Sequence, residues 1–430
     1  MDSRYRALWE DPDVVERIDH GIESFRKGDM VVEVRDGRGN PIANQQVTLT
    51  QISSDFLFGA NTFMLDAYSS PRDSLRYEDR FLELFNAGTV PLYWRDLEPE
   101  RGRLRFVRSS AHLRRRPPTD VVVEWGVANG LNLNGHPLVW DLVKWSVPDW
   151  VTDDQSRDGS VWKERVRRIG ERYGTSIARW DVINEVCTPW RLAAGESRPM
   201  PPDYARRAFE WAEAAMPAEA FLMINEVSEV SWSRDRGVYI DLVERLLREG
   251  ARVDGVGLQH HLFEDAQMHR VAAGEANTPA ILYGSLDDFA RLRRPLHISE
   301  ITMTSPRDGL DGPELQARIA RDFYRLWFSH PSVDSITWWN FADGSAAPGE
   351  DHVDSGLLDR HLNPKPAYEA LAELITHEWR TDLSTSTDAA GRVALRGFFG
   401  RYRISVGGSD IGGFHLEPSN ASVTVQASTL

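Results

Sequence analysis

The feature of this sequence that most limits its fold is an alternation of short apolar segments with amphipathic segments, repeated eight times between about residues 53 and 378. The apolar segments have strand composition and lie at 56–63, 89–94, 131–140, 178–186, 220–227, 253–262, 295–301 and 335–341. Segments with helical periodicity follow them, including 74–86, 161–174, 236–250 and 312–329. Eight such units predict an α/β protein with a (β/α)8 TIM barrel. A doubly wound open sheet is the alternative, but it predicts a G-x-G-x-x-G turn that the sequence lacks.

The two ends of the chain do not follow this alternation. Residues 11–27 have the pattern of a short amphipathic helix, and 29–35 and 45–52 alternate like strands. Residues 381–430 are rich in Ser, Thr, Gly and Val, with too few large apolar side chains for a core of their own. We therefore predict three parts: an N-terminal helix and strands (1–52), the barrel (53–378), and a C-terminal β module (379–430). The N-terminal part is expected to pack with the C-terminal one, so that together they form one small accessory β module beside the barrel.

Composition excludes some classes of partner. The formal net charge of −15 disfavours nucleic acid and anionic membranes, which bind basic patches. The sequence has no run of about 18 apolar residues and no signal peptide at its start, so the expected location is cytoplasmic, with a trimmed leader as the alternative. The single cysteine, Cys187, rules out an intrachain disulfide and leaves the redox compartment open.

Polar side chains gather at the ends of the predicted strands, where a barrel of this kind has its active site. Buried polar side chains cost roughly 1–3 kcal/mol each unless they are paired, so a large set of them indicates a site. The set is His136, Asn184, Glu185, Asn225, Glu226, Gln259, His260, His261, Glu300, Trp339 and Asn340.

Two of these side chains, Glu185 and Glu300, suit glycoside hydrolysis, in which one carboxyl donates a proton and the other attacks the anomeric carbon. Asn184 could bind the 2-hydroxyl of the sugar. Glu300 is the better nucleophile candidate, because Gln259 and His261 could hold it ionised. A retaining enzyme would place the two carboxyls about 5–5.5 Å apart.

The motifs "GHPLVW", "WDVINE", "VGLQHH", "HISE", "ITWWNFAD" and "NPKPAY" together resemble glycoside hydrolase family 10, the endo-β-1,4-xylanases. The resemblance implies retention of configuration, with Glu185 as acid/base and Glu300 as nucleophile. It also implies that His136, Asn184, Gln259, His261 and Trp339 surround the sugar at the point of cleavage, and that no metal or organic cofactor takes part. Trp140 and Trp94 are further sugar-binding candidates.

Several positions depart from the family pattern. The family has an Asn and a Lys in the region that is occupied here by Leu92, Tyr93 and Trp94. After the third-strand Trp, the family has a His and, a little further on, a Gln; this chain has Asp141 in place of the His and lacks the Gln. The segment 343–352 lacks a second Trp, and Thr302 replaces an Asp that pairs with the strand-six His, leaving His261 without a charged partner. These changes cluster on the glycone side of the bond to be cleaved.

The sequence thus predicts a retaining β-glycoside hydrolase with a carbohydrate substrate. The default is endo-1,4-β-xylanase-like cleavage of xylan or xylo-oligosaccharides. One alternative is a hydrolase, exo-acting or not, of a different β-glycoside such as a gluco-oligosaccharide or plant glycoside. The other is a non-catalytic carbohydrate-binding protein.

Other residues invite competing interpretations. Glu226 is a third strand-end carboxylate, which we expect to cap a loop. His260 and His261 with Glu264 suggest a metal, although neighbouring strand residues point to opposite faces. Cys187 lies near Glu185 but has no dedicated base, so we expect it to be a small buried filler.

Two further segments have structural and functional interpretations. The basic run "HLRRRPP" (112–118) is expected to be a solvated loop, with contact to an acidic sugar as the alternative. The aromatic residues of the β module are expected to pack in its core rather than bind carbohydrate; they are Phe398, Phe399, Tyr402 and Phe414.

Overall fold

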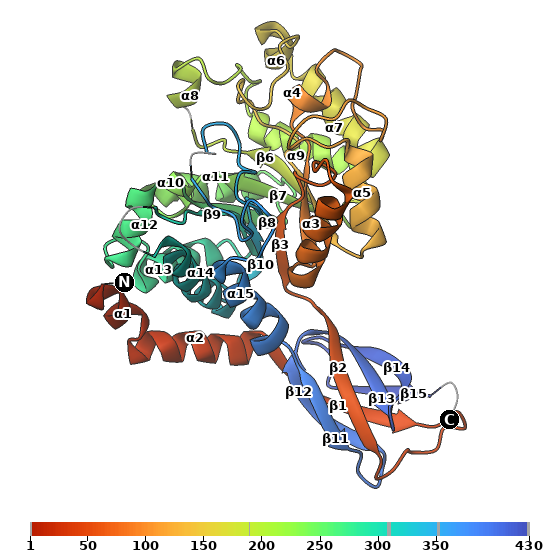
Figure 1. The fold of residues 1–430 in the computed structure, drawn as a ribbon. Helices are drawn as coiled ribbons and strands as arrows, with labels where there is room; N and C mark the ends of the chain where they lie inside the picture. Colours follow the sequence, from red (N-terminus) through yellow and green to blue (C-terminus); the bar gives the residue numbers. More distant parts are fainter. Residues whose placement is uncertain (1, 189, 308–310, 351–352, 428–430) are drawn as a thin grey trace.

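The structure of the protein, a computed structural model, describes residues 2–188, 190–307, 311–350 and 353–427 (Figure 1). Eight parallel strands close into a barrel in the order β10-β3-β4-β5-β6-β7-β8-β9, with helices around it, which confirms the predicted (β/α)8 fold. The strands are β3 (Leu57–Asn61), β4 (Ala87–Pro91), β5 (Asn132–His136), β6 (Arg179–Asn184), β7 (Phe221–Glu226), β8 (Gly255–Leu262), β9 (Leu296–Met303) and β10 (Val333–Trp338).

The barrel strands are buried on both faces, as is usual for a parallel sheet covered by helices, and in β6 and β9 even the polar residues are buried. The helices around the barrel are α3 (Pro71–Leu84), α5 (Thr119–Ala128), α7 (Ser160–Tyr173), α9 (Tyr204–Ala215), α11 (Gly237–Arg248), α13 (Pro279–Ala290), α14 (Gly312–Ser329) and α15 (Pro366–Ala372), which η2 (Glu373–Glu378) continues. Further helical segments lie in the loops: α4 (Trp94–Leu97), α6 (Asp153–Asp158), α8 (Trp190–Ala193), α10 (Ser228–Ser231), η1 (Arg234–Arg236) and α12 (Asp265–Ala272). Several helices begin as their sequence dictates; Ser70, for example, caps α3 ahead of a proline in the first turn.

The N-terminal segment contains two helices, α1 (Ser3–Trp9) and α2 (Pro12–Phe25), where the sequence predicted one. They pack against the barrel helix α14, which corrects the expectation that the N-terminal helix packs with the β module. The Tyr5 hydroxyl donates to Asp322 at 2.9 Å, and Trp9 stacks on Phe323 with ring centroids 5.4 Å apart. The apolar face of α14 that turns away from the barrel strands needs such a cover.

Strands from both ends of the chain form the accessory β module, which projects from the barrel in Figure 1. They are β1 (Lys27–Arg35), β2 (Gln46–Ser54), β11 (Asp382–Ser386), β12 (Arg392–Phe398), β13 (Gly400–Val406), β14 (Ser409–Leu416) and β15 (Ser422–Gln426). One sheet has the order β12-β1-β15 and the other β11-β2-β13-β14, so β1 and β2 lie inside sheets made otherwise of C-terminal strands. Tyr402 and Phe414 stack at 5.1 Å in the buried core between the sheets.

Within the described ranges, no helix combines the length and the apolar character that crossing a membrane requires.

Candidate active site

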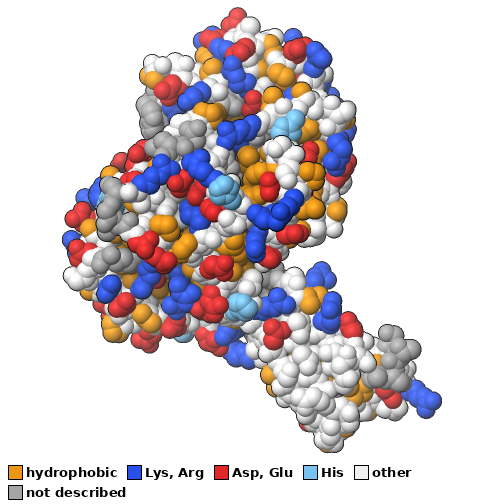
Figure 2. Space-filling model, in the orientation of Figure 1, with side chains coloured by type: hydrophobic (Ala, Val, Ile, Leu, Met, Phe, Trp, Pro, Cys, Tyr) orange, Lys and Arg blue, Asp and Glu red, His pale blue; other side chains and the backbone are white. Residues whose placement is uncertain are grey.

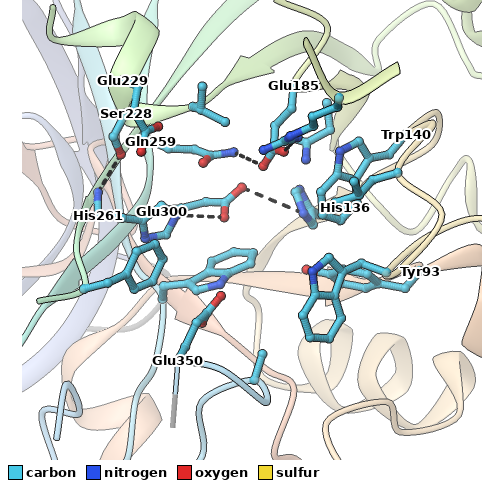
Figure 3. Close-up of a pocket in the computed structure, with 18 of the residues that line it drawn as sticks. Tyr93, His136, Trp140, Glu185, Ser228, Glu229, Gln259, His261, Glu300 and Glu350 are labelled. Atoms are coloured by element: carbon cyan, nitrogen blue, oxygen red, sulfur yellow. Dashed lines mark hydrogen bonds and ion pairs between the residues drawn. The ribbon is translucent and has the colours of Figure 1, made fainter. Parts of the chain in front are cut away.

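A cavity of about 200 Å³ opens at the carboxyl ends of the barrel strands. Figure 3 shows side chains from several of these strands converging on it. Its lining includes both predicted catalytic glutamates and every predicted sugar-binding residue except Trp94, whereas four other predicted strand-end residues lie outside it: Asn225, Glu226, His260 and Asn340. The lining residues are Tyr93, Arg115, Arg116, His136, Trp140, Leu142, Trp145, Asn184, Glu185, Arg191, Val227, Ser228, Glu229, Gln259, His261, Phe263, Glu300, Trp339, Ala347 and Glu350.

Glu300 is buried on β9 and is surrounded by hydrogen-bonding groups. The Asn225 amide donates to Glu300 Oε1 at 2.8 Å, and His261 Nε2 lies 3.3 Å from Oε2. His136 Nε2 lies 3.8 Å from Oε1 (Figure 3). Burial raises the pKa of Glu300 to about 8, and the charge of His136 opposes this rise. The carboxylate is therefore costly to ionise, with its charged form supported mainly by His136.

His136 in turn is held by a carboxylate behind it. Its Nδ1 lies 2.8 Å from Asp181 Oδ2, which also accepts from the Asn134 amide at 2.9 Å. Burial alone would lower the pKa of His136, but the charges of Glu300 and Asp181 raise it above its ordinary value. Asp181 and Asn134 were not predicted as site residues, although a carboxylate inside the apolar run of β6 is a signal that could have found it.

Glu185 follows directly after β6 with a left-handed backbone (φ 56°). This conformation turns its carboxyl into the cavity next to Gln259, whose amide donates to Glu185 Oε1 at 3.0 Å. Arg191 of α8 forms an ion pair with Oε2. Nothing in the sequence signalled Arg191, because it lies in a loop helix with no regular relation to the strand ends.

Asn184 is connected to the Glu300 carboxyl through Asn225. The Asn225 amide donates at 2.8 Å to Asn184 Oδ1 as well as to Glu300. Asn184 Nδ2 is buried and has no hydrogen-bond partner among the described residues. It can therefore donate to a ligand hydroxyl in the cavity.

His261 has a neutral partner, Thr302, at the position where the pattern described in the sequence analysis has an Asp. Its Nδ1 lies 2.9 Å from the Thr302 hydroxyl, and Phe263 stacks on the ring at 4.5 Å. Burial lowers the pKa of His261 below its ordinary value. The ring is therefore neutral at pH 7 and places no full positive charge beside Glu300.

Aromatic side chains form one wall of the cavity. Tyr93 meets Trp140 edge-on at 5.9 Å, and Trp339 meets the His136 ring at 5.3 Å. Both tryptophans line the cavity, as expected of sugar-binding residues.

The prediction for Trp94 was wrong. Trp94 begins α4, is only 1% exposed, and donates its indole N–H to Glu98 at 2.8 Å. It packs on Trp162 at 4.7 Å, outside the cavity. The chain turns into helix immediately after β4, so Tyr93 faces the cavity and its neighbour faces the core.

The basic run 112–118 is the expected solvated loop only over residues 112–114, which are exposed, whereas residues 115–118 are buried. Arg115 and Arg116 are only 5% and 8% exposed, and both line the cavity. Arg116 lies 3.6 Å over the Tyr93 ring and pairs with Asp96 at 3.0 Å. These cation–π and ion-pair partners come from the loop after β4, which the charge pattern of the run alone cannot reveal.

Glu226 lies behind the site, where it caps the loop after β6. It is buried outside the cavity and accepts backbone N–H groups of Cys187 at 2.7 Å and Val227 at 3.0 Å. Burial raises its pKa to about 7 and also raises that of the Cys187 thiol.

His260 and His261 point in opposite directions, as the strand geometry predicted. His260 packs between Trp232 and Trp327, at 5.0 and 5.2 Å, away from His261. Across the described part of the chain, no group of three His, Cys, Asp or Glu side chains is arranged to hold a metal.

Comparisons with known proteins agree with this geometry. The model of the family "Glycosyl hydrolase family 10" matches residues 92–374. Endo-1,4-beta-xylanase B of Thermotoga neapolitana is 26% identical over 298 residues, covering 66% of this chain and 78% of that protein. Anti-sigma-I factor RsgI6 of Acetivibrio thermocellus is 25% identical over 397 residues, which is 91% of this chain but only 46% of that protein.

Solved structures share the fold. Xylanase 10B from Thermotoga petrophila RKU-1, in complex with xylobiose, superposes with a TM-score of 0.60 and 22% identity, covering 75% of this chain and 95% of that one. The family match extends over well over half of the chain and includes both strand-end glutamates. The chain therefore belongs to glycosyl hydrolase family 10, as its motifs predicted, and is a glycoside hydrolase.

Proposed function

We propose that this protein is a retaining hydrolase of β-1,4-linked xylose chains, xylan or xylo-oligosaccharides, with Glu185 as acid/base and Glu300 as nucleophile. One observation carries the proposal: two buried carboxyls, Glu185 directly after β6 and Glu300 on β9, line the same small cavity, and a side-chain amide donates to each of them. The names of the relatives, endo-1,4-beta-xylanases, support the choice of sugar.

The proposed reaction has two steps. In the first, Glu300 attacks the anomeric carbon while Glu185 gives its proton to the glycosidic oxygen, so that the bond to the leaving sugar breaks. In the second, Glu185 takes a proton from water, whose oxygen attacks the anomeric carbon and releases the Glu300 carboxylate. The protons balance, because Glu185 ends each cycle protonated.

The surroundings of Glu300 suit a nucleophile. Burial makes the charged form of Glu300 costly. Because the carboxylate loses its charge when it forms the glycosyl ester, this cost favours its attack on the anomeric carbon. His136, backed by Asp181, keeps a positive charge beside it so that the ionised form remains accessible.

The surroundings of Glu185 add one requirement. A general acid must be protonated, and a protonated carboxyl cannot keep its ion pair with Arg191. The proposal therefore requires Arg191 to leave the Glu185 carboxyl before the first step.

The proposal is tested with 4-nitrophenyl β-xyloside and β-xylobioside, on wild type, Glu300→Ala and Glu185→Ala. We expect Glu300→Ala to lose about 10⁴-fold or more in kcat. Glu185→Ala should lose about 10²–10⁴-fold on xylotriose, whose leaving sugar needs protonation, and less on the 4-nitrophenyl glycosides, whose leaving group departs without it. Added azide should restore turnover in both, giving the α-glycosyl azide with Glu300→Ala and the β-glycosyl azide with Glu185→Ala.

Glu226→Gln is the matched control, since it removes a buried strand-end carboxylate that does not line the cavity. It should show no azide rescue. Activity that persists in Glu300→Ala would contradict the mechanism. Binding of xylobiose by wild type without hydrolysis of any aryl β-glycoside would favour a carbohydrate-binding protein instead.

A further inference from the structure

The two ends of the cavity face different parts of the substrate. A leaving group must lie beside the residue that protonates it, so Glu185, after β6, marks the leaving-group end. In the barrel order, β10 is four strands away from β6 and therefore opposite it, while β4 lies midway between them, two strands from each. Arg115, in the loop after β4, reaches over to Asn340 and Ser345, which follow β10. The loops after β4 and β10 thus surround the glycone sugar, which remains on the enzyme in the first step.

The glycone end is closed on the side of Tyr93, Arg115 and Arg116, although Glu350 at the same end is partly exposed, whereas the leaving-group end is open. Tyr93, Arg115 and Arg116 line the cavity but are almost completely buried, so solid protein stands behind them. At the other end, Arg191 and Ser228 are partly exposed and Glu229 is exposed. The volume of about 200 Å³ is also smaller than the roughly 300–1,000 Å³ of a typical small-molecule pocket. The closed end has little room for a chain of sugars.

Arg115 is a rigidly held donor at this closed end. Its guanidinium donates to Asn340 Oδ1 at 3.2 Å and to the Ser345 carbonyl, and it lies 5.3 Å over the Phe63 ring. Its Nε is buried and has no hydrogen-bond partner in the described ranges. Burial lowers the pKa of Arg115 to about 10, which still leaves it charged at neutral pH.

Glu350 supplies an acceptor at the same end. Figure 3 shows its carboxylate pointing into the cavity from the side opposite Glu185. Its Oε2 is buried, again without a hydrogen-bond partner in the part of the chain that the structure describes. Glu350 lines the same cavity as Arg115 and Tyr93, and its charge raises the pKa of both groups.

We infer that Arg115 and Glu350 clamp the hydroxyls of a single, neutral, non-reducing terminal sugar, so that the enzyme removes one sugar at a time. The inference rests on the proposed function and adds the glycone length to it. A sugar hydroxyl both donates and accepts, so one donor and one acceptor match a pair of neighbouring hydroxyls. With the anomeric carbon at Glu300 and the 2-hydroxyl at Asn184, the clamp meets the 3- and 4-hydroxyls. Arg116 is paired with Asp96, and the charge of Arg115 is opposed by that of Glu350, so this end offers a uronate no free cation among the described residues and the sugar is neutral.

The test compares aryl glycosides with one and two sugars on the glycone side. We expect wild type to hydrolyse 4-nitrophenyl β-xyloside with a higher kcat/KM than the β-xylobioside, and to release xylose first from xylotetraose. Glu350→Ala should lower kcat/KM on the xyloside on the order of 10- to 100-fold, the effect of losing a charge-assisted hydrogen bond. Its effect on the xylobioside should be smaller, because the truncation opens the closed end.

A substrate lacking the 4-hydroxyl identifies the contact. Wild type should lose on the order of 10- to 100-fold on the 4-deoxyxyloside, while Glu350→Ala should treat the two xylosides alike. Glu229→Ala is the matched control, because it removes a carboxylate from the leaving-group end of the same cavity. In Glu229→Ala, the ratio of kcat/KM on the xyloside to that on the xylobioside should match wild type, and so should the ratio between the xyloside and the 4-deoxyxyloside. Glu350→Gln keeps the shape of the side chain but removes its charge. It is measured beside Glu350→Ala so that an effect of the lost charge can be told apart from an effect of misfolding.

Two results would overturn the inference. If wild type prefers the xylobioside, and Glu350→Ala does not change that preference, the inferred clamp is rejected while the proposed function stands. If wild type hydrolyses neither glycoside, the proposed function fails first. The clamp is then judged by calorimetric binding of methyl β-xyloside, and binding that Glu350→Ala does not weaken rejects it.

Discussion

A buried carboxyl such as Glu300 couples the chemistry of the site to the stability of the fold. The environment that raises its pKa also makes the folded protein hold a proton that the unfolded chain releases. Between its ordinary value of 4.5 and about 8, this carboxyl therefore contributes less to stability as the pH rises. The slope is at most about 1.4 kcal/mol per pH unit.

This coupling predicts the effect of Glu300→Gln, which cannot ionise. The melting temperature of the variant minus that of wild type should become more positive from pH 5 to pH 8, as measured by thermal unfolding followed by circular dichroism. Glu164→Gln is the control, because the arginines at Glu164 lower the pKa of that exposed carboxyl to about 2. Its stabilising ionisation is complete above pH 5, so its difference should stay flat. A flat difference for Glu300→Gln would mean that the carboxyl is not the buried, proton-holding group described above.

The sequence predicted those residues of the site that lie at the ends of strands, because the strand pattern fixes their position in the barrel. Glu185 and Glu300 end apolar runs in the sequence, and a closed barrel brings such ends together whatever the loops do. Arg115, Arg191 and Glu350 lie in loops, where charge alone does not distinguish a buried, partnered side chain from a solvated one. The catalytic candidates were thus predictable, whereas the residues at the two ends of the cavity were not.

At the scale of elements, a helix behind the site fixes the two segments that shape it. Arg165 on α7 is buried and donates to the backbone carbonyls of Leu138 at 2.9 Å, Pro137 at 3.0 Å and Leu92. These carbonyls belong to the segments after β4 and β5 that carry Tyr93 and Trp140 into the cavity. A single guanidinium therefore connects α7 to the aromatic wall.

Replacing Arg165 should affect both stability and catalysis. Arg165→Met leaves these buried carbonyls without their donor, at a cost of about 1–3 kcal/mol for each unsatisfied group. We expect a lower melting temperature and a lower kcat/KM on the aryl xylosides. Arg168→Met, on the same helix, removes only a partly exposed ion pair with Glu164 and should change either quantity little. Equal effects of the two changes would show that Arg165 has no special supporting role.

Most element positions followed from periodicity, and the exceptions have local causes. The pattern at 312–329 coincides with α14, because eighteen residues of amphipathic sequence leave little choice of register. The strand predicted at 89–94 is β4 at 87–91, since the chain turns into α4 as soon as it leaves the barrel. This shift of a few residues is the origin of the error at Trp94.

At the scale of the whole molecule, the two ends of the chain depend on each other. Figure 2 shows many charged side chains on the barrel, while the visible face of the β module is mostly uncharged. The module's apolar core is shared between strands from the two ends, with Val32 and Leu49 from the N-terminal part and Leu395 and Ile404 from the C-terminal part. The change in composition at about residue 381 indicated a module, but the pairing of β1 with β12 and β15 depends on contacts nearly 400 residues apart, which a local pattern does not contain.

This sharing predicts the outcome of truncation from either side. A chain of residues 1–380 keeps α1 and α2 on α14, but β1 and β2 lose all their neighbouring strands and expose Val32 and Leu49. A chain of residues 55–430 loses β1 and β2 and also the contacts of Tyr5 and Trp9 with α14. Because apolar burial contributes about 25 cal/mol per Å², we expect both chains to bind the dye ANS and to melt below the full chain, with 55–430 the lowest. A 1–380 chain that is monomeric, binds no ANS and melts with the full chain would show instead that the module contributes nothing to the stability of the barrel.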